Sequence, residues 1–289
     1  MRKTPCFAVI GGDNRQVYLT EFLHGEGFTI QSYGLPECGV APSGNECENL
    51  ASALDGADFI ILPLPATRDG INIFSGKNTC IPISDLFGYA CSGQIIFGGK
   101  LSGALAEEAK KHGIRLYDYY EREDLTTMNA IPTAEGAVKL AIESVPFTLH
   151  GSRCMVTGYG RISKLLTKLL SAFGADVTVA ARSLRDISLA EAFGFKTVKT
   201  GEIEQVISHF DIIFNTVPAR IIDERALKKL KDGSLIIDLA SPPGGTDFEA
   251  AEETGANVIW ALSLPGKTAP KSAAYIIGET ILKMIEEVK

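Results

Sequence analysis

A glycine turn in the second half of the chain has the residue types and spacing that bind phosphate groups. It reads Gly158-Tyr-Gly160-Arg-Ile-Ser163 and lies between an apolar run, Cys154–Thr157, and a stretch with leucines at helical spacing. The first glycine permits a tight turn, the second lets a phosphate approach the backbone, and the amides that begin the helix favour negative charge. We therefore predict that a dinucleotide binds here, beside Gly158, Tyr159, Gly160, Arg161 and Ile162.

Ser163 occupies the third small position of this turn, where such sites usually have glycine or alanine. The position serves the packing of the helix on the strand, and serine is small enough for it. The motif would be weak without its flanking strand and helix. An ordinary turn with two glycines is therefore the alternative interpretation.

The end of the next expected strand, 176–181, indicates which dinucleotide binds. An NAD site usually has an acid there for the ribose 2′-hydroxyl, whereas this strand ends at Arg182 and Ser183, and the first acid is Asp186. A guanidinium suits a 2′-phosphate, and a serine hydroxyl adds a donor. The sequence thus favours NADP over NAD and disfavours a methyltransferase, which needs an acid at a ribose diol. The alternative is that Arg182 is a solvated charge.

Three later segments of the second half are expected to line the same site, because the carboxyl ends of parallel strands meet at one edge of the sheet. They read NTVPA, DLASPPGGTDF and LPGKTAPK. The predicted cofactor contacts are Asn215, Thr216, Val217, Pro218, Ala240, Ser241, Leu264 and Pro265. Ser241 and Lys267 are the candidate catalytic groups, although Lys267 reads equally well as a surface lysine.

The first half has a glycine turn of its own, IGGDNRQ at 10–16, without the spacing of the dinucleotide motif. Its amides and its arginine suit a substrate carboxylate better than a second cofactor. A second strand exit, ILPLPATRDG at 61–70, adds hydroxyl and guanidinium groups. The charge run at 121–124 is expected to be a solvated face. The predicted substrate-binding residues are Gly11, Gly12, Arg15 and Thr67.

A histidine acid or base, common in hydride-transfer enzymes, is not visible in the sequence. The four histidines lie near expected helix ends or in the connector rather than in a strand-end loop. No nucleophile motif, phosphate-loop lysine or metal-ligand spacing occurs, so no metal site is predicted.

Both halves alternate strand and helix, which predicts an α/β fold with parallel sheets. We expect two Rossmann-like, doubly wound domains with a cleft between them, joined by helices, one of them at 132–144. The substrate domain is predicted at 1–148 together with a closing helix at 272–289, and the NAD(P)-binding domain at 149–271.

Composition excludes several classes of protein. The 289 residues carry a net charge of −7 without any basic run, which argues against nucleic-acid binding. No apolar stretch reaches the about 18 residues of a membrane span, and the N-terminal apolar run is too short for a signal peptide. The six cysteines form no C-x-x-C pair, so reduced thiols in a cytoplasmic protein are expected.

Together these segments resemble the family of the dipicolinate synthase A subunit of spore-forming bacteria. The matching pieces run in the family's order over residues 10–274: IGGDNRQ, ILPLPATRDG, EREDL, IPTAEG, HGSR, GYGR, ARS, NTVPA, DLASPPGGTDF and LPGKTAPKSA. Two positions depart from the family pattern, Ser163 in place of glycine and Pro242 in place of a basic residue.

The resemblance implies an oxidoreductase that converts a dihydrodipicolinate-level intermediate of the lysine branch to pyridine-2,6-dicarboxylate. A nicotinamide cofactor, expected to be NADP, would accept the hydride. The resemblance also implies a flavoprotein-like partner, the B subunit of the synthase, and a place in the mother-cell cytoplasm during sporulation. We expect a homo-oligomer as well.

Two other functions remain open from sequence. One is a non-catalytic NADP-binding regulatory or scaffold protein, although a sensor needs no substrate domain. The other is an amino- or imino-acid dehydrogenase related to alanine dehydrogenase. Activity on a linear amino acid in the absence of the B subunit would favour the latter.

Overall fold

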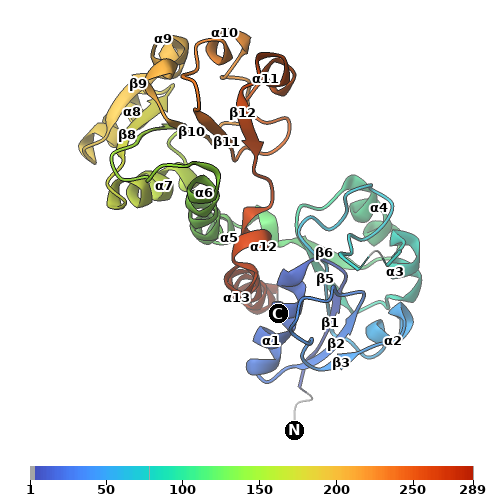
Figure 1. Cartoon of the computed structure of the whole chain (residues 1–289). Coiled ribbons are helices and arrows are strands. Elements are labelled where there is room, and N and C mark those ends of the chain that lie inside the picture. The colour runs from blue at the N-terminus through green and yellow to red at the C-terminus, as the bar shows by residue number, and fades with distance from the viewer. Residues whose placement is uncertain (1–3, 78, 289) are drawn as a thin grey trace. The chain divides into compact units, whose positions relative to one another are not determined.

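The computed structural model describes residues 4–77 and 79–288, which fold into two compact units (Figure 1). The first unit runs to Asn129 and resumes at Ala269, and the second spans Ala130–Thr268. The predicted boundaries, at 148/149 and 271/272, differ from these. Helix α6 (Ala130–Ser144) packs on α7 (Arg161–Ala172) and so lies in the second unit, whereas the sequence prediction put it in the first.

The first unit contains a six-stranded parallel sheet in the order β3-β2-β1-β4-β5-β6. The connections reverse direction between β1 and β4, which is the arrangement of a doubly wound fold. Its strands are β1 (Cys6–Ile10), β2 (Thr29–Tyr33), β3 (Asn45–Glu46), β4 (Phe59–Ile61), β5 (Ile95–Gly98) and β6 (Arg115–Asp118).

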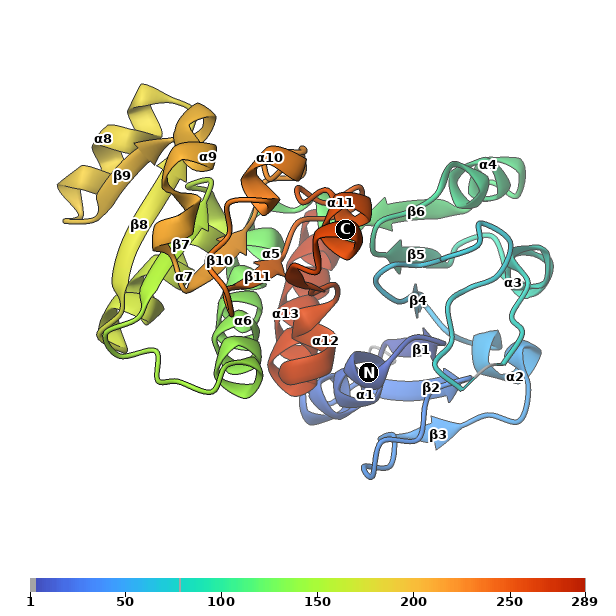
Figure 2. The ribbon, with the colours of Figure 1, turned by 45° about the horizontal axis from the view of Figure 1, so that its top comes forward.

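Helices cover both faces of this sheet because the side chains of β1 alternate between two apolar cores. Phe7 and Val9 pack against α1 (Asn14–Gly25), α5 (Glu123–Met128) and α13 (Pro270–Val288). The short 3-10 helix η1 (Tyr119–Glu121) precedes α5. Ala8 and Ile10 face α2 (Leu50–Leu54), α3 (Ile83–Tyr89) and α4 (Gly103–Lys111). Figures 1 and 2 both show α13 alongside α1, so the end of the chain completes the first unit.

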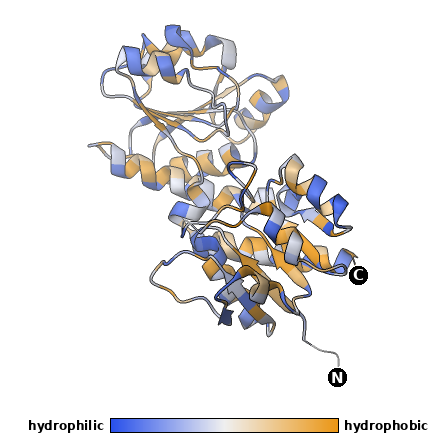
Figure 3. Cartoon of the chain, turned by 90° about the vertical axis from the view of Figure 1, so that its right-hand side faces the viewer, coloured by the Kyte–Doolittle hydropathy of each residue, from blue (hydrophilic) through white to orange (hydrophobic). Residues whose placement is uncertain are grey.

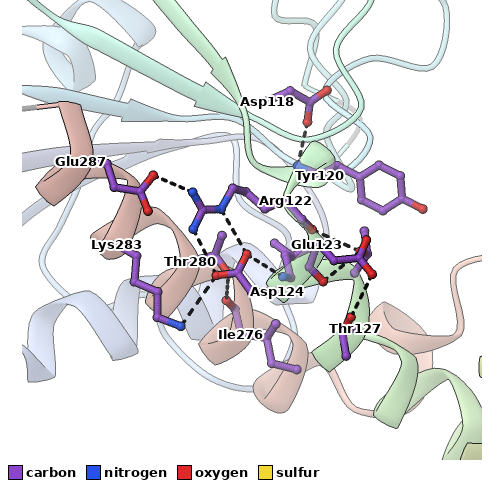
Figure 4. A network of polar contacts seen from close by, with 12 residues as sticks. Asp118, Tyr120, Arg122, Glu123, Asp124, Thr127, Ile276, Thr280, Lys283 and Glu287 are labelled. Carbon is purple, nitrogen blue, oxygen red and sulfur yellow. Dashed lines mark hydrogen bonds and ion pairs between the residues drawn. The ribbon is translucent and has the colours of Figure 1, made fainter. Parts of the chain in front are cut away.

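The charge run at 121–124 binds the C-terminal helix instead of facing only solvent (Figure 4). Arg122 donates from Nη1 to Glu287 Oε2 at 2.6 Å and from Nε to Asp124 Oδ1 at 3.1 Å. Lys283 Nζ lies 3.8 Å from Asp124 Oδ2. The hydrogen bond from Arg122 lowers the pKa of the Asp124 carboxyl. The expectation of a purely solvated face was wrong, because these charges link α5 to α13.

The second unit repeats the architecture, with the strand order β12-β11-β10-β7-β8-β9. The connections reverse between β7 and β10. Its strands are β7 (Arg153–Thr157), β8 (Asp176–Ala181), β9 (Lys196–Lys199), β10 (Ile212–Asn215), β11 (Leu235–Asp238) and β12 (Asn257–Trp260), all parallel. The predicted α/β class, with two doubly wound parallel sheets, is confirmed.

Two helical layers enclose this second sheet. One layer contains α6, α7, α8 (Leu184–Ala192) and α12 (Leu264–Thr268). The other contains α9 (Ile203–Val206), α10 (Glu224–Leu227) and α11 (Phe248–Thr254), with the 3-10 turns η2 (Thr200–Glu202) and η3 (Ile207–His209) nearby. Figure 3 shows orange, apolar strands and helices that mix orange with blue, as expected for amphipathic covering helices.

Two kinds of feature are absent from residues 4–77 and 79–288. None of the helices there is both long and apolar enough to cross a membrane. The same residues contain no group of three His, Cys, Asp or Glu side chains placed to hold a metal ion.

Candidate dinucleotide site in the second unit

The glycine turn that follows β7 lies directly against the loop that follows β10. Gly158 has φ +80°, and a Cβ there would lie 2.9 Å from Thr216 Oγ1 and 3.0 Å from Val217 Cγ2. Its N–H donates to Ala180 O at 2.8 Å, which fixes the turn to β8. A side chain at this position would push the two strand exits apart, so the close approach requires glycine.

Ser163 joins the same contact from the first turn of α7. The residue is fully buried, and its Oγ lies 2.8 Å from Thr216 Oγ1. The Thr216 hydroxyl donates to Thr157 O at 2.7 Å. The departure from the usual glycine or alanine therefore keeps the helix close to the sheet and adds a hydrogen-bonded link across the point where the strand order reverses.

The N-terminus of α7 faces open space. Gly160 is the N-cap residue, with φ −85° and ψ −162°, and because it has no side chain the helix lacks a side-chain cap. A Cβ built on Gly160 would meet no atom within 4 Å. A helix N-terminus without a side-chain cap, with free volume beside it, fits a pyrophosphate group. Arg161 is exposed at this end, Ile162 is half-buried, and Tyr159 is buried against Val179 and Ala181.

The exit of β8 presents Arg182 and Ser183 to solvent. Ser183 is the N-cap of α8, and its Oγ accepts the N–H of Asp186 at 3.1 Å, which leaves the hydroxyl proton for another acceptor. The Arg182 guanidinium has no hydrogen bond or ion pair within residues 4–77 and 79–288. Both side chains thus lie where a ribose approaches in such a sheet, at the carboxyl end of the strand beside β7.

Asn215, predicted to touch the cofactor, is instead fully buried and holds two loops together. Its Nδ2 donates to Asp238 Oδ1 at 2.9 Å and to Val217 O at 3.1 Å. Its Oδ1 accepts from Thr157 Oγ1 and from the N–H of Val217. The side chain has no surface left for a ligand, so it acts by shaping the loop whose tip, Pro218, is exposed.

Asp238, which the sequence prediction did not single out, organises the loop that follows β11. The carboxylate is fully buried and accepts five hydrogen bonds, all between 2.9 and 3.0 Å. The donors are Asn215 Nδ2, the N–H groups of Ala240, Gly245 and Thr246, and Thr246 Oγ1. An acid that ends an otherwise apolar strand was the available signal.

The remaining predicted residues of the second unit divide by exposure. Ala240, Leu264 and Pro265 are buried, so their side chains support the strand exits. Ser241 is exposed beside Pro242, and Lys267 is exposed on α12 rather than in a loop. The structure gives no contact between these two candidate catalytic groups.

In the first unit, the corresponding glycine turn is covered by the protein's own backbone. The N–H of Gly11 donates to Tyr33 O at 2.9 Å, and that of Gly12 to Phe74 O at 2.6 Å. The N–H of Gly76 returns a bond to Gly12 O at 2.7 Å. The two amides expected to hold a carboxylate are therefore already bonded, that of Gly11 to the end of β2 and that of Gly12 to the segment that follows β4.

Arg15 and Thr67 are engaged inside the first unit as well. Arg15 is 5% exposed, and its Nε and Nη2 each donate to Asp13 at 2.8 Å, while Nη2 also reaches Leu64 O. Burial alone acts to lower the pKa of this guanidinium, but Asp13 raises it above its ordinary value. Thr67 Oγ1 accepts the N–H of Gly70 at 2.8 Å. The expected carboxylate contacts from these residues are thus replaced by internal bonds.

Comparison with known proteins places this geometry in a family. A curated protein of Bacillus subtilis (strain 168), the A subunit of dipicolinate synthase, is 33% identical over 286 residues, which are 98% of this chain and 96% of the relative. The chain belongs to the family of the dipicolinate synthase A subunit. The family described as the N-terminal domain of that A subunit matches residues 6–120.

Two solved structures agree with the membership. The dipicolinate synthase A subunit from Bacillus halodurans matches with a TM-score of 0.88 at 28% identity, covering 97% of each chain. The A chain of dipicolinate synthase from Bacillus subtilis matches with a TM-score of 0.85 at 32% identity, covering 100% of this chain and 98% of the other.

The second unit of this member of the dipicolinate synthase family is a nicotinamide-binding domain of dehydrogenase type. The family described as D-isomer specific 2-hydroxyacid dehydrogenase, NAD binding domain matches residues 134–242. That range includes the glycine turn, Arg182, the loop after β10 and the first residues of the loop after β11. Leu264, Pro265 and Lys267 lie outside it. The roles of the individual residues, inside and outside this range, stay predictions.

Proposed function

We propose that this chain is the dehydrogenase component of a dipicolinate synthase. It would oxidise a dihydrodipicolinate-level intermediate to pyridine-2,6-dicarboxylate with NADP⁺ as the hydride acceptor. The observation that carries the proposal is the N-terminus of α7, which no side chain caps and where Gly160 leaves open space, with Arg182 exposed at the end of the next strand.

The cofactor would be held by three groups of this chain. The first-turn amides of α7 and the Gly158–Gly160 turn bind the pyrophosphate. Arg182 and the Ser183 hydroxyl bind the 2′-phosphate. The exits of β10 and β11, fixed by Asn215 and Asp238, lie along the crevice at which such sheets bind the remainder of the dinucleotide.

The proposed reaction removes one hydride and one proton from the dihydropyridine ring. A bound oxidised nicotinamide supplies the hydride acceptor. Aromatisation of the ring contributes much of the driving force, so a strong protein base is not required, and water can take the proton. The task of the chain is then to orient the ring C–H bond and to hold two carboxylates.

The remaining parts of the proposal rest on the family resemblance. We infer that the B subunit of the synthase, which is flavoprotein-like, works with this chain, and that the chain itself forms a homo-oligomer. The reaction would belong to the lysine branch and would proceed in the cytoplasm of the mother cell during sporulation.

A coupled assay tests the proposed function. Dihydrodipicolinate synthase generates the unstable intermediate in place, and the pyridine dicarboxylate is followed by its ultraviolet absorbance, with NADP⁺ or NAD⁺ and with or without the B subunit. We expect product only when this chain and NADP⁺ are both present. If NADP(H) bound tightly but no combination gave product, the dehydrogenase proposal would be wrong and a regulatory role would be favoured.

The cofactor preference has its own test in Arg182→Ala. Loss of a charge-assisted bond should weaken NADP⁺ binding by about 1.5–3 kcal/mol, while NAD⁺ affinity stays unchanged. Titration of both cofactors by calorimetry measures the difference. Arg225→Ala, which removes an exposed arginine on the opposite helical layer, is the matched control. Equal losses for NADP⁺ and NAD⁺ would remove the 2′-phosphate assignment.

A further inference from the structure

The first unit needs a cation for a substrate carboxylate, and its buried arginine does not supply one. The Nε and Nη2 groups of Arg15 donate hydrogen bonds to Asp13 and to Leu64 O. The amides of Gly11 and Gly12 are bonded to backbone carbonyls. A carboxylate at the carboxyl edge of this sheet must therefore be bound by another group.

Arg68 lies in the segment that covers the glycine turn. Its guanidinium carbon lies 3.6 Å from the centre of the Phe74 ring, so the two groups are in contact. Phe74 is fixed at the point where the strand order reverses, since its carbonyl accepts the N–H of Gly12 at 2.6 Å and its own N–H donates to Ala66 O at 2.9 Å. Ligands of open α/β sheets bind at this point.

The loop that bears Arg68 is held by its own hydrogen bonds. Asp69 Oδ1 accepts the N–H groups of Ile71 and Asn72 at 2.8 Å, and its Oδ2 accepts Asn72 Nδ2 at 2.8 Å. The Asn72 backbone and side chain lower the pKa of this carboxyl far below its usual range. Asp69 thus stays ionised and committed to the loop, and it forms no ion pair with its neighbour Arg68 among the residues described.

Arg68 is consequently a charged group without an anionic partner among the described residues. The side chain is exposed, and its guanidinium has no hydrogen bond or ion pair in the described part of the chain. Contact with an aromatic face holds the fork of N–H groups in place and leaves it open at the edge. Such a fork matches a carboxylate in a bidentate fashion, and fixing it beforehand reduces the entropy lost on binding.

We propose that Arg68, held over Phe74, binds one carboxylate of the pyridine-type dicarboxylate substrate. The inference rests on the proposed function and names the substrate-binding cation of that reaction. The guanidinium of Arg68 was noted from sequence at this strand exit but was not included among the predicted substrate-binding residues, because the phenylalanine that fixes it lies six positions further along a loop of no recognisable motif.

The test is equilibrium binding of pyridine-2,6-dicarboxylate, the stable product, to the full chain saturated with NADPH. Arg68→Gln should weaken dicarboxylate binding by about 10- to 100-fold, the scale of a lost charge-assisted pair. Arg68→Lys retains the charge but not the fork, so a smaller loss of about 3- to 10-fold is expected. NADPH affinity and the melting temperature should stay at wild-type values in both variants.

Arg115→Gln is the matched control. Arg115 is an exposed arginine of the same unit, but it begins β6 and so lies at the opposite, amino edge of the sheet. Its replacement should leave dicarboxylate binding unchanged. Wild-type affinity in Arg68→Gln, or an equal loss in Arg115→Gln, would overturn the assignment of Arg68. A wild-type chain that binds NADPH but no dicarboxylate would overturn the proposed function itself.

Discussion

Gly160→Asp is expected to abolish cofactor binding while the second unit stays folded. Gly160 is the N-cap of α7 in extended backbone, and nothing lies within 4 Å of a Cβ built there. Aspartate is a favoured N-cap residue, and its charge stabilises a helix N-terminus. The same carboxylate would occupy the amides and repel a pyrophosphate, so affinity for NADP⁺ and NAD⁺ should each fall by about 100-fold or more.

Calorimetric titration measures the affinities, and thermal unfolding measures the fold. The control is Gly160→Asn, which has nearly the same shape and also caps helices but carries no charge. Asparagine should weaken the affinity for both cofactors by about 10-fold. The difference in affinity between the two variants measures the effect of the carboxylate charge. Unchanged affinity in Gly160→Asp would show that the pyrophosphate does not bind at this turn.

The glycine turn of the second unit could be predicted because its determinants are contiguous. The strand, Gly158, Gly160 and the helix follow one another within one segment, and each residue's role depends on its neighbours in sequence. Ser163 was predictable only in part. Its small size could be read from the motif, but the bond to Thr216 joins residues 53 positions apart, and no local pattern shows it.

The first unit shows where local patterns fail. IGGDNRQ has the glycines and the arginine of an anion site, and its strand-to-helix context was predicted correctly. The amides are nevertheless taken by Tyr33 O and Phe74 O, from segments about 20 and 60 residues away. Asp13, only two positions from Arg15, neutralises it. The amide bonds depend on how distant segments of the chain return to the turn, whereas the pairing of Asp13 with Arg15 is local.

The same limit applies to the connecting segments. A helix at 132–144 was predicted from apolar spacing, and α6 spans Ala130–Ser144, but whether it belongs to one unit or the other depends on its packing against α7. The charge run at 121–124 looked solvated because its partners, Lys283 and Glu287, lie at the other end of the chain. Spacing predicts elements well, whereas the assignment of their faces requires the tertiary fold.

Asp238→Ala is expected to be the most destabilising single change at the candidate cofactor site. The substitution would leave five donors without their acceptor in a site that water does not reach. Removing a buried charged acceptor leaves its donors unsatisfied, which is expected to lower the free energy of unfolding by about 3–5 kcal/mol. Asparagine should not rescue the site, because its NH₂ group would face N–H donors where the loop needs an acceptor.

The fluorescence of Trp260 can follow the unfolding of the Asp238→Ala variant. Trp260 is the single tryptophan, it stacks on Phe248 at 4.6 Å, and its Nε1 donates to Ala240 O at 3.0 Å. Ala240 is itself one of the residues bonded to Asp238. Tryptophan fluorescence during urea unfolding therefore follows the loop that Asp238 organises.

A control variant distinguishes the stability lost with a buried carboxylate from that lost with an ordinary helix cap. Asp223 caps α10 by accepting the N–H of Ala226 at 3.0 Å and is exposed, so Asp223→Ala should cost only about 1 kcal/mol. A free energy of unfolding that fell equally in the two variants would mean that the loop after β11 reorganises around the missing acceptor. The larger fall expected for Asp238→Ala would instead show that this acid holds the exits of β10 and β11 in one shape, which is the shape on which cofactor binding depends.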